Sequence, residues 1–358
     1  MQGGATGPAL QYTSFLTLQD INMKIAIIGA GAIGGLVGVR LALAGEDVTF
    51  IVRGANLAAI RSKGMKLIEH DGIERVAANV RATDDYNEAG SQDVVILALK
   101  AHQVESVVDE LPKLFGEHTT VITMQNGIPY WYFQSHGGEF EGRRVESVDP
   151  TGIISAAIPA RRVIGCVVYP ASELIAPGVV RHIEGDRFPL GELDGASSER
   201  VQALSAMFGK AGFKAPVLEN IRAEIWLKLW GNLTFNPISG LTHSTLVDIC
   251  QFPLSRALAT SMMTEAQDVA NKLGITFRVP LEKRIAGAEK VGKHKTSMLQ
   301  DIEAGRGPEI DALVGSVIEL GRLTRTPTPH IDTVYALVKL LAKTMAEESG
   351  NVRLQKAV

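Results

Sequence analysis

The chain has 358 residues, of which 46% are hydrophobic and 21% are charged, and its formal net charge is −3. This length exceeds the usual range of a single domain, so we expect two domains. The balanced charge provides no general attraction to nucleic acid or to an anionic membrane surface, and we expect neither as a partner.

Residues 1–22 precede the first predicted strand and lack both a cationic start and a continuous apolar core, so they do not have the pattern of a signal peptide. We expect a disordered extension ahead of a compact domain that begins at Met23. The two cysteines, Cys166 and Cys250, are far apart and show no metal-ligand spacing. They indicate neither a disulfide framework nor a metal site, and they favour a reducing, cytoplasmic compartment.

A strand, a glycine-rich turn and a helix open the compact domain. The apolar run 25–28 is typical of a strand that is buried on both faces. Gly29, Gly31 and Gly34 follow with the spacing G-x-G-x-x-G, and the Ala-rich segment 33–44 predicts a helix. In this order of elements, the glycine spacing indicates a dinucleotide-binding site.

Each glycine has a physical role at such a site. Gly29 permits the tight turn, Gly31 lets a pyrophosphate approach the backbone, and Gly34 lets the helix pack closely on the sheet. The unpaired N–H groups at the start of the helix then face the anion. The plainer interpretation is a glycine-rich helix in an ordinary α/β core; glycines and Arg40 interrupt the run too often for a membrane span. The predicted cofactor-binding residues of this turn are Gly29, Ala30, Gly31, Ala32, Ile33 and Gly34.

The end of the second predicted strand, at 48–52, indicates which dinucleotide binds. A site for NAD carries an acidic residue there that bonds the ribose 2′-OH, whereas this chain has Arg53. A guanidinium at this point pairs with a 2′-phosphate through its planar fork. We therefore predict NADP(H) as the cofactor; the alternative is that Arg53 is a solvated charge at the end of a strand.

Strands and helices alternate in the next part of the chain. Lys100 and Asn126 each end a predicted strand, and ligands lie beyond the carboxyl ends of the strands in open α/β sheets. The two residues are therefore candidates for the site, although a surface lysine and an ordinary turn explain them equally well. The predicted elements are helices at 57–63 and 103–111, a hairpin of strands at 65–68 and 76–80, and strands at 93–100 and 120–124.

Residues 128–163 have no regular pattern and contain the aromatic run 130–133, so we expect an insertion or a lid near the substrate. Three short strands are predicted after it, at 163–169, 178–183 and 188–191. We expect these strands to extend the sheet.

The pattern then becomes helical. A helix at 196–212 is followed by further helices with no intervening strand pattern. The predicted fold is therefore an α/β domain with a mostly parallel sheet at 23–218 and an all-helical domain at 219–350. The helices of the second domain are predicted at 219–236, 254–273, 281–303, 309–324 and 331–348.

The first helix of the second domain carries a polar stripe. Glu224, Lys228, Asn232 and Asn236 recur every four residues on one face, and apolar side chains cover the rest. A helix this apolar is expected to be buried, so its stripe needs partners or a ligand. The plainer interpretation is an asparagine ladder between helices with an ordinary Glu224–Lys228 ion pair. Beside a nicotinamide, a buried lysine would instead stabilise and protonate a ketone oxygen as hydride arrives.

Several motifs occur in order along the chain: Gly29-x-Gly31-x-x-Gly34, Leu99-Lys100-Ala101-x-Gln103, Gln125-Asn126-Gly127, Arg222-Ala223-Glu224-Ile225-Trp226-x-Lys228, Asn232-x-x-x-Asn236-Pro237, Ser297-Met298-Leu299-Gln300-Asp301 and Glu309-Ile310-Asp311. Together they resemble the ketopantoate reductase (2-dehydropantoate 2-reductase) family. The glycine motif alone is not specific to that family. The run from Lys228 to Pro237, followed by the motifs at 297–301 and 309–311, is specific to it.

This resemblance implies a Rossmann-like domain and a helical domain with the active site between them. It implies NADPH-dependent reduction of 2-dehydropantoate to pantoate, a step of pantothenate and coenzyme A biosynthesis. By the same resemblance, Lys228 is the general acid, Asn232 and Asn236 hold the substrate, and Ser297 contacts its carboxylate end. Glu309 is a second catalytic residue that contacts cofactor or substrate across the cleft.

The resemblance also places Lys100 and Asn126 on the nicotinamide side, and we assign Ala171 to the cofactor site with them. Two departures from the family pattern leave the substrate open: 128–163 is long, and 238–245 lacks a later asparagine. The alternatives are a related NADP-dependent reductase of another 2-keto acid and a catalytically silent NADP-binding regulator. A homodimer through the helical domain is expected by analogy.

Overall fold

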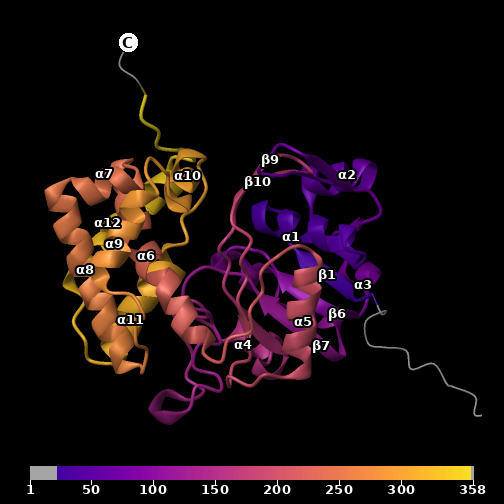
Figure 1. The fold of residues 1–358 in the computed structure, drawn as a ribbon, viewed down its shortest axis with the longest axis horizontal. Helices are drawn as coiled ribbons and strands as arrows, with labels where there is room; N and C mark the ends of the chain where they lie inside the picture. Colours follow the sequence, from indigo (N-terminus) through magenta and orange to yellow (C-terminus); the bar gives the residue numbers. More distant parts are fainter. Residues whose placement is uncertain (1–21, 356–358) are drawn as a thin grey trace, which may run out of the picture.

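The computed structural model describes residues 22–355. The extension expected at 1–22 therefore lies outside the described residues, except for Asn22. The chain forms a first half around two β-sheets and a second half of helices, which confirms the predicted fold class (Figure 1). Between residues 22 and 355, no helix has both the length and the apolar character that a membrane crossing needs.

A seven-stranded sheet forms the centre of the first half, in the order β11-β8-β7-β6-β1-β2-β5. Every neighbouring pair is parallel except β11 with β8. Ile25 and Ile27 enter one apolar core while Ala26 and Ile28 enter the other, so both faces of the sheet are covered and its strands are apolar runs. The strands are β1 (Lys24–Ile28), β2 (Asp47–Ile51), β5 (Arg81–Thr83), β6 (Gln92–Leu97), β7 (Phe115–Thr123), β8 (Val163–Cys166) and β11 (Leu190–Gly191).

A second, four-stranded sheet lies against helix α1, in the order β4-β3-β10-β9. The predicted hairpin is confirmed as β3 with β4. The prediction that 178–183 extends the main sheet is wrong, because β10 pairs with β3 and with β9, a strand that the sequence did not predict. Gly35 makes this possible, since Met65 and Val180 occupy the space that its Cβ would fill on α1. The elements are α1 (Ala32–Leu43), β3 (Met65–Ile68), β4 (Glu74–Ala77), β9 (Ala171–Ala176) and β10 (Val179–Glu184).

The helix predicted at 103–111 is replaced by two 3-10 segments. Their backbone bonds join residues three apart, as in the bond from Val108 N–H to the Glu105 oxygen. The tight turn leaves the Ala101 N–H outside the local bonding, where the second half of the chain reaches it. The remaining helices of the first half are α2 (Gly54–Lys63), α3 (Tyr86–Ala89), η1 (Ala101–Val107), η2 (Leu111–Leu114), η3 (Gly138–Phe140), α4 (Ile153–Ala157), η4 (Ala160–Arg162) and α5 (Glu199–Lys210).

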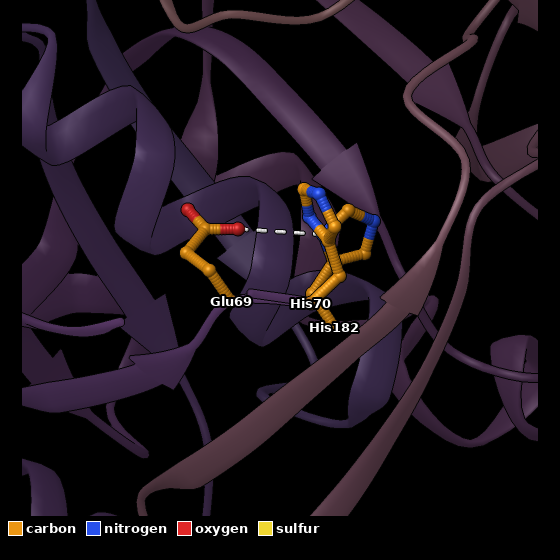
Figure 2. A group of neighbouring side chains, drawn as sticks. All are labelled: Glu69, His70 and His182. Carbon is orange, nitrogen blue, oxygen red and sulfur yellow. Dashed lines mark hydrogen bonds and ion pairs between the residues drawn. The ribbon is translucent and has the colours of Figure 1, made fainter. Parts of the chain in front are cut away.

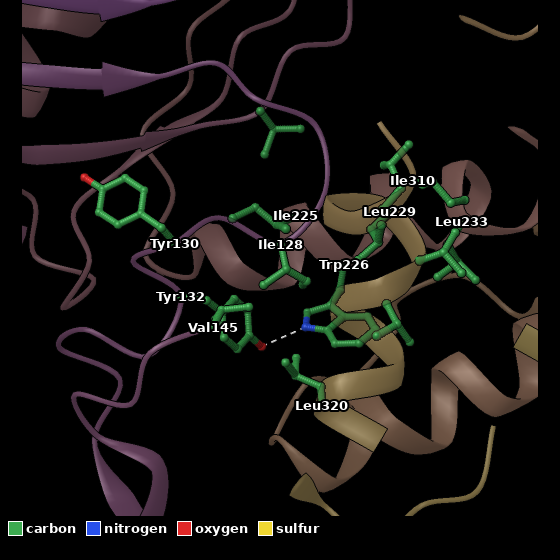
Figure 3. Close-up of a cluster of buried hydrophobic side chains, with 14 of the residues drawn as sticks. Ile128, Tyr130, Tyr132, Val145, Ile225, Trp226, Leu229, Leu233, Ile310 and Leu320 are labelled. Carbon is green, nitrogen blue, oxygen red and sulfur yellow. Dashed lines mark hydrogen bonds between the residues drawn. The ribbon is translucent and has the colours of Figure 1, made fainter. Parts of the chain in front are cut away.

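Residues 128–163 are mostly irregular, as predicted, but their aromatic run does not form a lid. The side chains of 130–133 are between 0% and 5% exposed. Tyr132 accepts a hydrogen bond of 2.7 Å from Trp226 Nε1 on α6 (Figure 3). The run is therefore a packed wall between the sheet and the helical half, because burying these rings stabilises more than exposing them at a cleft.

Helix α6 joins the two halves and is longer than predicted, since it continues through Pro237 to Thr242. Pro237 removes one helical N–H, but the turn after it stays helical because Gly240 packs closely on Met298 and Ile302. The helices of the second half are α6 (Ile221–Thr242), α7 (Leu246–Gln251), α8 (Pro253–Lys272), α9 (Leu281–Lys290), α10 (Ser297–Glu303), the π-helical η5 (Asp311–Gly315), α11 (Ser316–Leu323) and α12 (Pro329–Glu347).

The single helix predicted at 281–303 is two helices, α9 and α10, and the short α7 was not predicted. Gly292 adopts a left-handed backbone conformation with φ of +80°, which interrupts the helical path after α9. Thr296 then accepts a hydrogen bond from the Leu299 N–H and caps α10. This break directs the start of α10 toward the middle of α6.

Candidate active site

The carboxyl-terminal edge of the main sheet faces the middle of α6. Asn126 follows β7, Val168 follows β8, and both bind Lys228 of α6. Lys228 Nζ donates to Asn126 Oδ1 at 2.6 Å and to the carbonyl oxygen of Val168. An ammonium group has three N–H donors, so one remains for a ligand. The lysine thus faces the sheet, and the predicted alternative of a helical ion pair with Glu224 does not form.

A pocket of about 260 Å³ lies beside this lysine. One side is lined by Gln125, which follows β7, and by Cys166, the last residue of β8; Ile225 and Asn232 of α6 line the other side. The pocket thus lies between the carboxyl-terminal edge of the sheet and the polar stripe of α6.

The electrostatics of the pocket centre on Lys228. Burial lowers the pKa of Lys228 to about 8, while the negative charge of Glu309 acts in the opposite direction. Burial raises the pKa of the neighbouring Cys166 to about 12, so this thiol remains neutral. The site holds an ammonium whose proton is readily transferred near neutral pH.

Lys100 and Glu309 lie where the two halves cross. Glu309 Oε1 accepts a hydrogen bond of 3.0 Å from the Ala101 N–H at the start of η1. Lys100 Nζ forms an ion pair of 2.5 Å with Asp301 of α10. Two acidic residues of the second half, Glu309 and Asp301, thus bind the consecutive residues Ala101 and Lys100. These contacts hold the sheet edge against the helical half.

The two asparagines of the stripe continue from Lys228 toward α10. Asn232 lines the pocket. Asn236 is only 6% exposed, and its Nδ2 lies 3.5 Å from the Oγ of Ser297, the first residue of α10. A contact of this length is weak, so the amide and the hydroxyl keep hydrogen-bonding capacity for a ligand.

Glu224, the remaining residue of the stripe, belongs to a cluster that sequence reasoning missed. Its carboxylate is 2% exposed and bonds Arg187, the Tyr169 hydroxyl at 2.7 Å and Arg278 at 2.8 Å. Burial would raise the pKa of Glu224, but the hydrogen bonds and charges of these partners hold it below the ordinary value. Tyr169 ends a strand that the sequence predicts, and this position is the only sequence feature that indicates a place for Tyr169 in the site.

The glycine turn has the geometry that its spacing predicts. Gly29 has a φ of +97°, and a Cβ on Gly34 would collide with the Gly29 carbonyl oxygen. Gly31 lies at the start of α1 with nothing within 4 Å of where a Cβ would stand. Ala32 and Ile33 are partly exposed beside it while Ala30 is buried. The open space at Gly31 and the free amides of α1 fit a pyrophosphate.

Arg53 and Ala171 are the two remaining residues of the predicted cofactor site. Arg53 follows β2, is exposed and precedes the first turn of α2 without capping it. This is the position from which a guanidinium reaches a ribose 2′-substituent. Ala171 begins β9, three residues after Val168, and pairs with Glu184 in the small sheet.

A separate polar cluster, formed by Glu69, His70 and His182, offers ligand atoms within 4.8 Å of one another (Figure 2). Arg40 of α1 binds Glu69 at 2.5 Å and lies 3.2 Å from His182 Nδ1. Burial would raise the pKa of Glu69, but the hydrogen bond and charge of Arg40 hold it below the ordinary value. A guanidinium thus already neutralises the carboxylate, and we interpret the cluster as an ion pair that fastens α1 to the small sheet.

A mostly parallel sheet with a glycine-lined turn, facing a partly buried helical lysine, defines a Rossmann-like oxidoreductase that uses a dinucleotide. Residues 25–195 match the family model described as Ketopantoate reductase PanE/ApbA, and residues 220–342 match the model of its C-terminal part. The chain belongs to the ketopantoate reductase family.

Individual relatives agree along nearly the whole chain. A 2-dehydropantoate 2-reductase from Mesorhizobium japonicum is 56% identical over 321 residues, which cover 89% of this chain and 98% of that protein. Another 2-dehydropantoate 2-reductase, from Pyrococcus horikoshii, is 30% identical over 318 residues, which cover 88% of this chain and 97% of that protein. The crystal structure described as a ketopantoate reductase from Ralstonia solanacearum MolK2 is 44% identical, with a TM-score of 0.87. The match covers 91% of this chain and 99% of that chain. The predicted family, fold class and enzyme class are confirmed.

The two glycines of the turn make a matched pair of tests. Gly31→Ala adds a methyl group to open space, so we expect unchanged thermal stability but NADPH binding weakened about tenfold or more, or ~1.4 kcal/mol. Gly34→Ala forces the backbone apart at Gly29, so we expect a lower melting temperature as well. Calorimetric titration and thermal unfolding measure the two effects; equal NADPH affinity in Gly31→Ala and wild type would contradict the assignment.

Proposed function

We propose that this protein catalyses the NADPH-dependent reduction of 2-dehydropantoate to pantoate, a step toward coenzyme A. The observation that carries the proposal is the partly buried Lys228 ammonium, held by Asn126 and Val168 at the edge of a sheet whose first turn fits a pyrophosphate. Membership of the ketopantoate reductase family supports the substrate.

NADPH would be held by the glycine turn and by Arg53, with Lys100, Asn126 and Ala171 on the nicotinamide side. The amides at the start of α1 attract the pyrophosphate, and the exposed guanidinium of Arg53 is free to pair with the 2′-phosphate. When bound, the reduced nicotinamide supplies a hydride to the keto carbon.

Lys228 acts as the general acid in this proposal. Two of its N–H groups are committed to Asn126 and Val168, so the third is directed at the substrate's keto oxygen. Negative charge develops on that oxygen as the carbonyl is reduced, and the adjacent ammonium stabilises it and then donates a proton from Nζ. The oxygen becomes the hydroxyl of the product, and the lysine regains a proton from solvent.

Asn232, Asn236 and Ser297 would orient the substrate with amide and hydroxyl groups along the stripe. Glu309 would act electrostatically, because its carboxylate raises the pKa of Lys228 against the effect of burial. A related 2-keto acid is the second candidate substrate, since residues 238–245 offer no further asparagine to the site.

We also propose a division into an NADP-binding domain at 23–218 and a substrate domain at 219–350. A homodimer through the helical domain is supported by exposed apolar residues on one side of α12, where Leu337 is 51% and Leu340 61% exposed. A cytoplasmic location is supported by the two cysteines, which are both free and buried.

The activity is tested by following NADPH absorbance with 2-dehydropantoate and a panel of related 2-keto acids. We expect 2-dehydropantoate to have the highest kcat/KM. Lys228→Ala should lower kcat by about 10²- to 10⁴-fold, the usual effect of losing a general acid, and should retain NADPH binding. Full turnover in Lys228→Ala would remove the lysine from the mechanism, and a better substrate in the panel would reassign the enzyme.

The pH profile tests the protonation state of Lys228. Because the acid must carry its proton, kcat/KM should be level below pH about 8 and fall above it. Glu309→Gln removes the charge that raises the lysine pKa, so the falling limb should move to lower pH. Glu347→Gln, on the exposed end of α12, serves as the control and should leave the profile in place. If the fall of kcat/KM occurs at the same pH in Glu309→Gln as in wild type, the proposed effect of Glu309 on the pKa of Lys228 is contradicted.

The choice of cofactor is tested at Arg53. Arg53→Ala should weaken NADPH binding by about 10- to 100-fold, the range for losing a charge-assisted bond, and should leave NADH binding nearly unchanged. Lys63→Ala, at the other end of α2, is the matched control because it removes an exposed cation from the same helix. If Arg53→Ala lowers the affinity for NADPH and NADH equally, or lowers neither, the assignment of Arg53 to the 2′-phosphate of NADPH is contradicted.

A further inference from the structure

Tyr169 is an aromatic residue beside Lys228 to which the proposed mechanism gives no role. It follows Val168, whose carbonyl oxygen accepts a hydrogen bond from Lys228 Nζ. The centroid of its ring lies 5.9 Å from the same Nζ atom. A cation within about 6 Å of an aromatic centroid is attracted by the negative face of the ring. Two consecutive residues at the sheet edge therefore interact with the ammonium, one through an oxygen and one through a ring.

The hydroxyl of Tyr169 fixes the position of this ring. It donates to Glu224 Oε1 at 2.7 Å, and Glu224 lies one turn before Lys228 on α6. Burial raises the pKa of the Tyr169 hydroxyl, and the hydrogen bond and the charge of Glu224 raise it further, so the phenol is neutral and acts as a donor. The ring is thereby anchored at one end by its backbone in the sheet half and at the other end by the helix that carries the lysine.

Two arginines neutralise the carboxylate that anchors the ring. Glu224 is 2% exposed and bonds Arg187 of the first half and Arg278 of the second half. The Arg187 guanidinium also lies 5.1 Å from the centroid of the Tyr169 ring. Two cations thus balance one buried anion, which leaves no net negative charge for the lysine. The cluster therefore acts on the lysine through the place of the ring and not through the charge of Glu224.

The ammonium of Lys228 needs a further attraction because burial disfavours its charge. Burial lowers the pKa of Lys228 to about 8, and Glu309 and Cys166 are the titratable groups whose charges act in the opposite direction. Cys166 is neutral, since burial raises the pKa of its thiol to about 12. The ring of Tyr169 adds to the attraction of the Glu309 carboxylate. Unlike a carboxylate, a ring cannot accept the proton, so it stabilises the ammonium without competing with the substrate for that proton.

We propose that Tyr169 is a positioning residue for the general acid: its ring, anchored through Glu224, holds the Lys228 ammonium with one N–H directed at the substrate. The inference rests on the proposed function. The hydrogen bonds to Asn126 and Val168 define an axis about which Nζ can still move. A third attraction, from a ring that is fixed at both ends, reduces that motion and favours the protonated lysine before hydride transfer.

Tyr169→Met and Tyr169→Phe separate the ring from the hydroxyl. Tyr169→Met replaces the ring by an unbranched apolar side chain. The falling limb of kcat/KM should therefore move to lower pH by roughly half a unit, and kcat should fall about tenfold as the acid loses its alignment. Tyr169→Phe retains the ring and both arginine bonds of Glu224, so the limb should stay at the wild-type pH and kcat should fall less. NADPH affinity should be unchanged in both variants.

Tyr335→Met is the matched control for the loss of the ring. The Tyr335 hydroxyl donates to Asp311 at 2.6 Å, and Lys339 Nζ lies 5.9 Å from the centroid of the Tyr335 ring, so α12 carries a pair of the same kind. Its ammonium is not the general acid, so the falling limb should remain at the wild-type pH. An equal shift in Tyr335→Met and Tyr169→Met would reveal a general loss of structure and would overturn the inference.

The titration of Lys228 is also measured without turnover, from the pH dependence of its acetylation by acetic anhydride, followed by mass spectrometry of the peptide that contains it. Only the deprotonated amine reacts, so the midpoint should be lower in Tyr169→Met than in wild type and Tyr169→Phe. If wild type oxidises no NADPH with any 2-keto acid, the proposed function fails, while that difference still supports the attraction between ring and ammonium. A common midpoint for the three proteins, or an equal shift in Tyr169→Phe, would overturn the inference.

Discussion

The three hydrogen bonds available to one partly buried ammonium, that of Lys228, determine how the two halves of this molecule meet. Lys228 lies on a helix whose other faces are apolar, so its charge can be tolerated only where polar groups meet that helix. The ends of two adjacent strands, at Asn126 and Val168, provide them. Because each strand end is fixed by the sheet, α6 has one position along the sheet edge at which the lysine is satisfied, and that position also leaves one N–H free.

The apolar and ionic contacts around α6 hold it at that position. One turn before the lysine, the buried Glu224 bonds Tyr169 and Arg187 of the sheet half, so rotation of the helix would leave a charge unpaired in the interior. Between Glu224 and the lysine, Trp226 donates to Tyr132 within a shared apolar core. Buried ion pairs are weak sources of stability, yet they specify an arrangement, and here the arrangement is the alignment of an acid catalyst with a cofactor site.

Local signals in the sequence were sufficient for the parts of this molecule that depend on local physics. The apolar strands, the glycine turn and the polar stripe each follow from backbone sterics or from periodicity, and the structure has all three. The sequence was misleading where distant segments decide: β10 leaves the main sheet because Gly35 lets a second sheet approach α1, and α6 continues past Pro237 because Gly240 packs on α10. Tyr169 and Arg187 could not be paired with Glu224 before the sheet brought them together. For 128–163 the sequence allows an insertion or a lid, and composition alone does not show that the aromatic run 130–133 within it is buried.

Glycines on α1 and on α6 both leave space that a side chain would fill. At α1, the bare backbone of Gly31 leaves room for an anion to meet helix amides, and Gly34 lets the helix touch the preceding turn. At α6, the bare backbone of Gly231 leaves room for a cation, the Arg284 guanidinium. An interior glycine costs a helix roughly 0.5–1 kcal/mol relative to alanine, so each must be offset by a contact that a side chain would prevent. At α1 that contact is partly made within the protein, whereas at α6 the guanidinium gains no bond from the described residues.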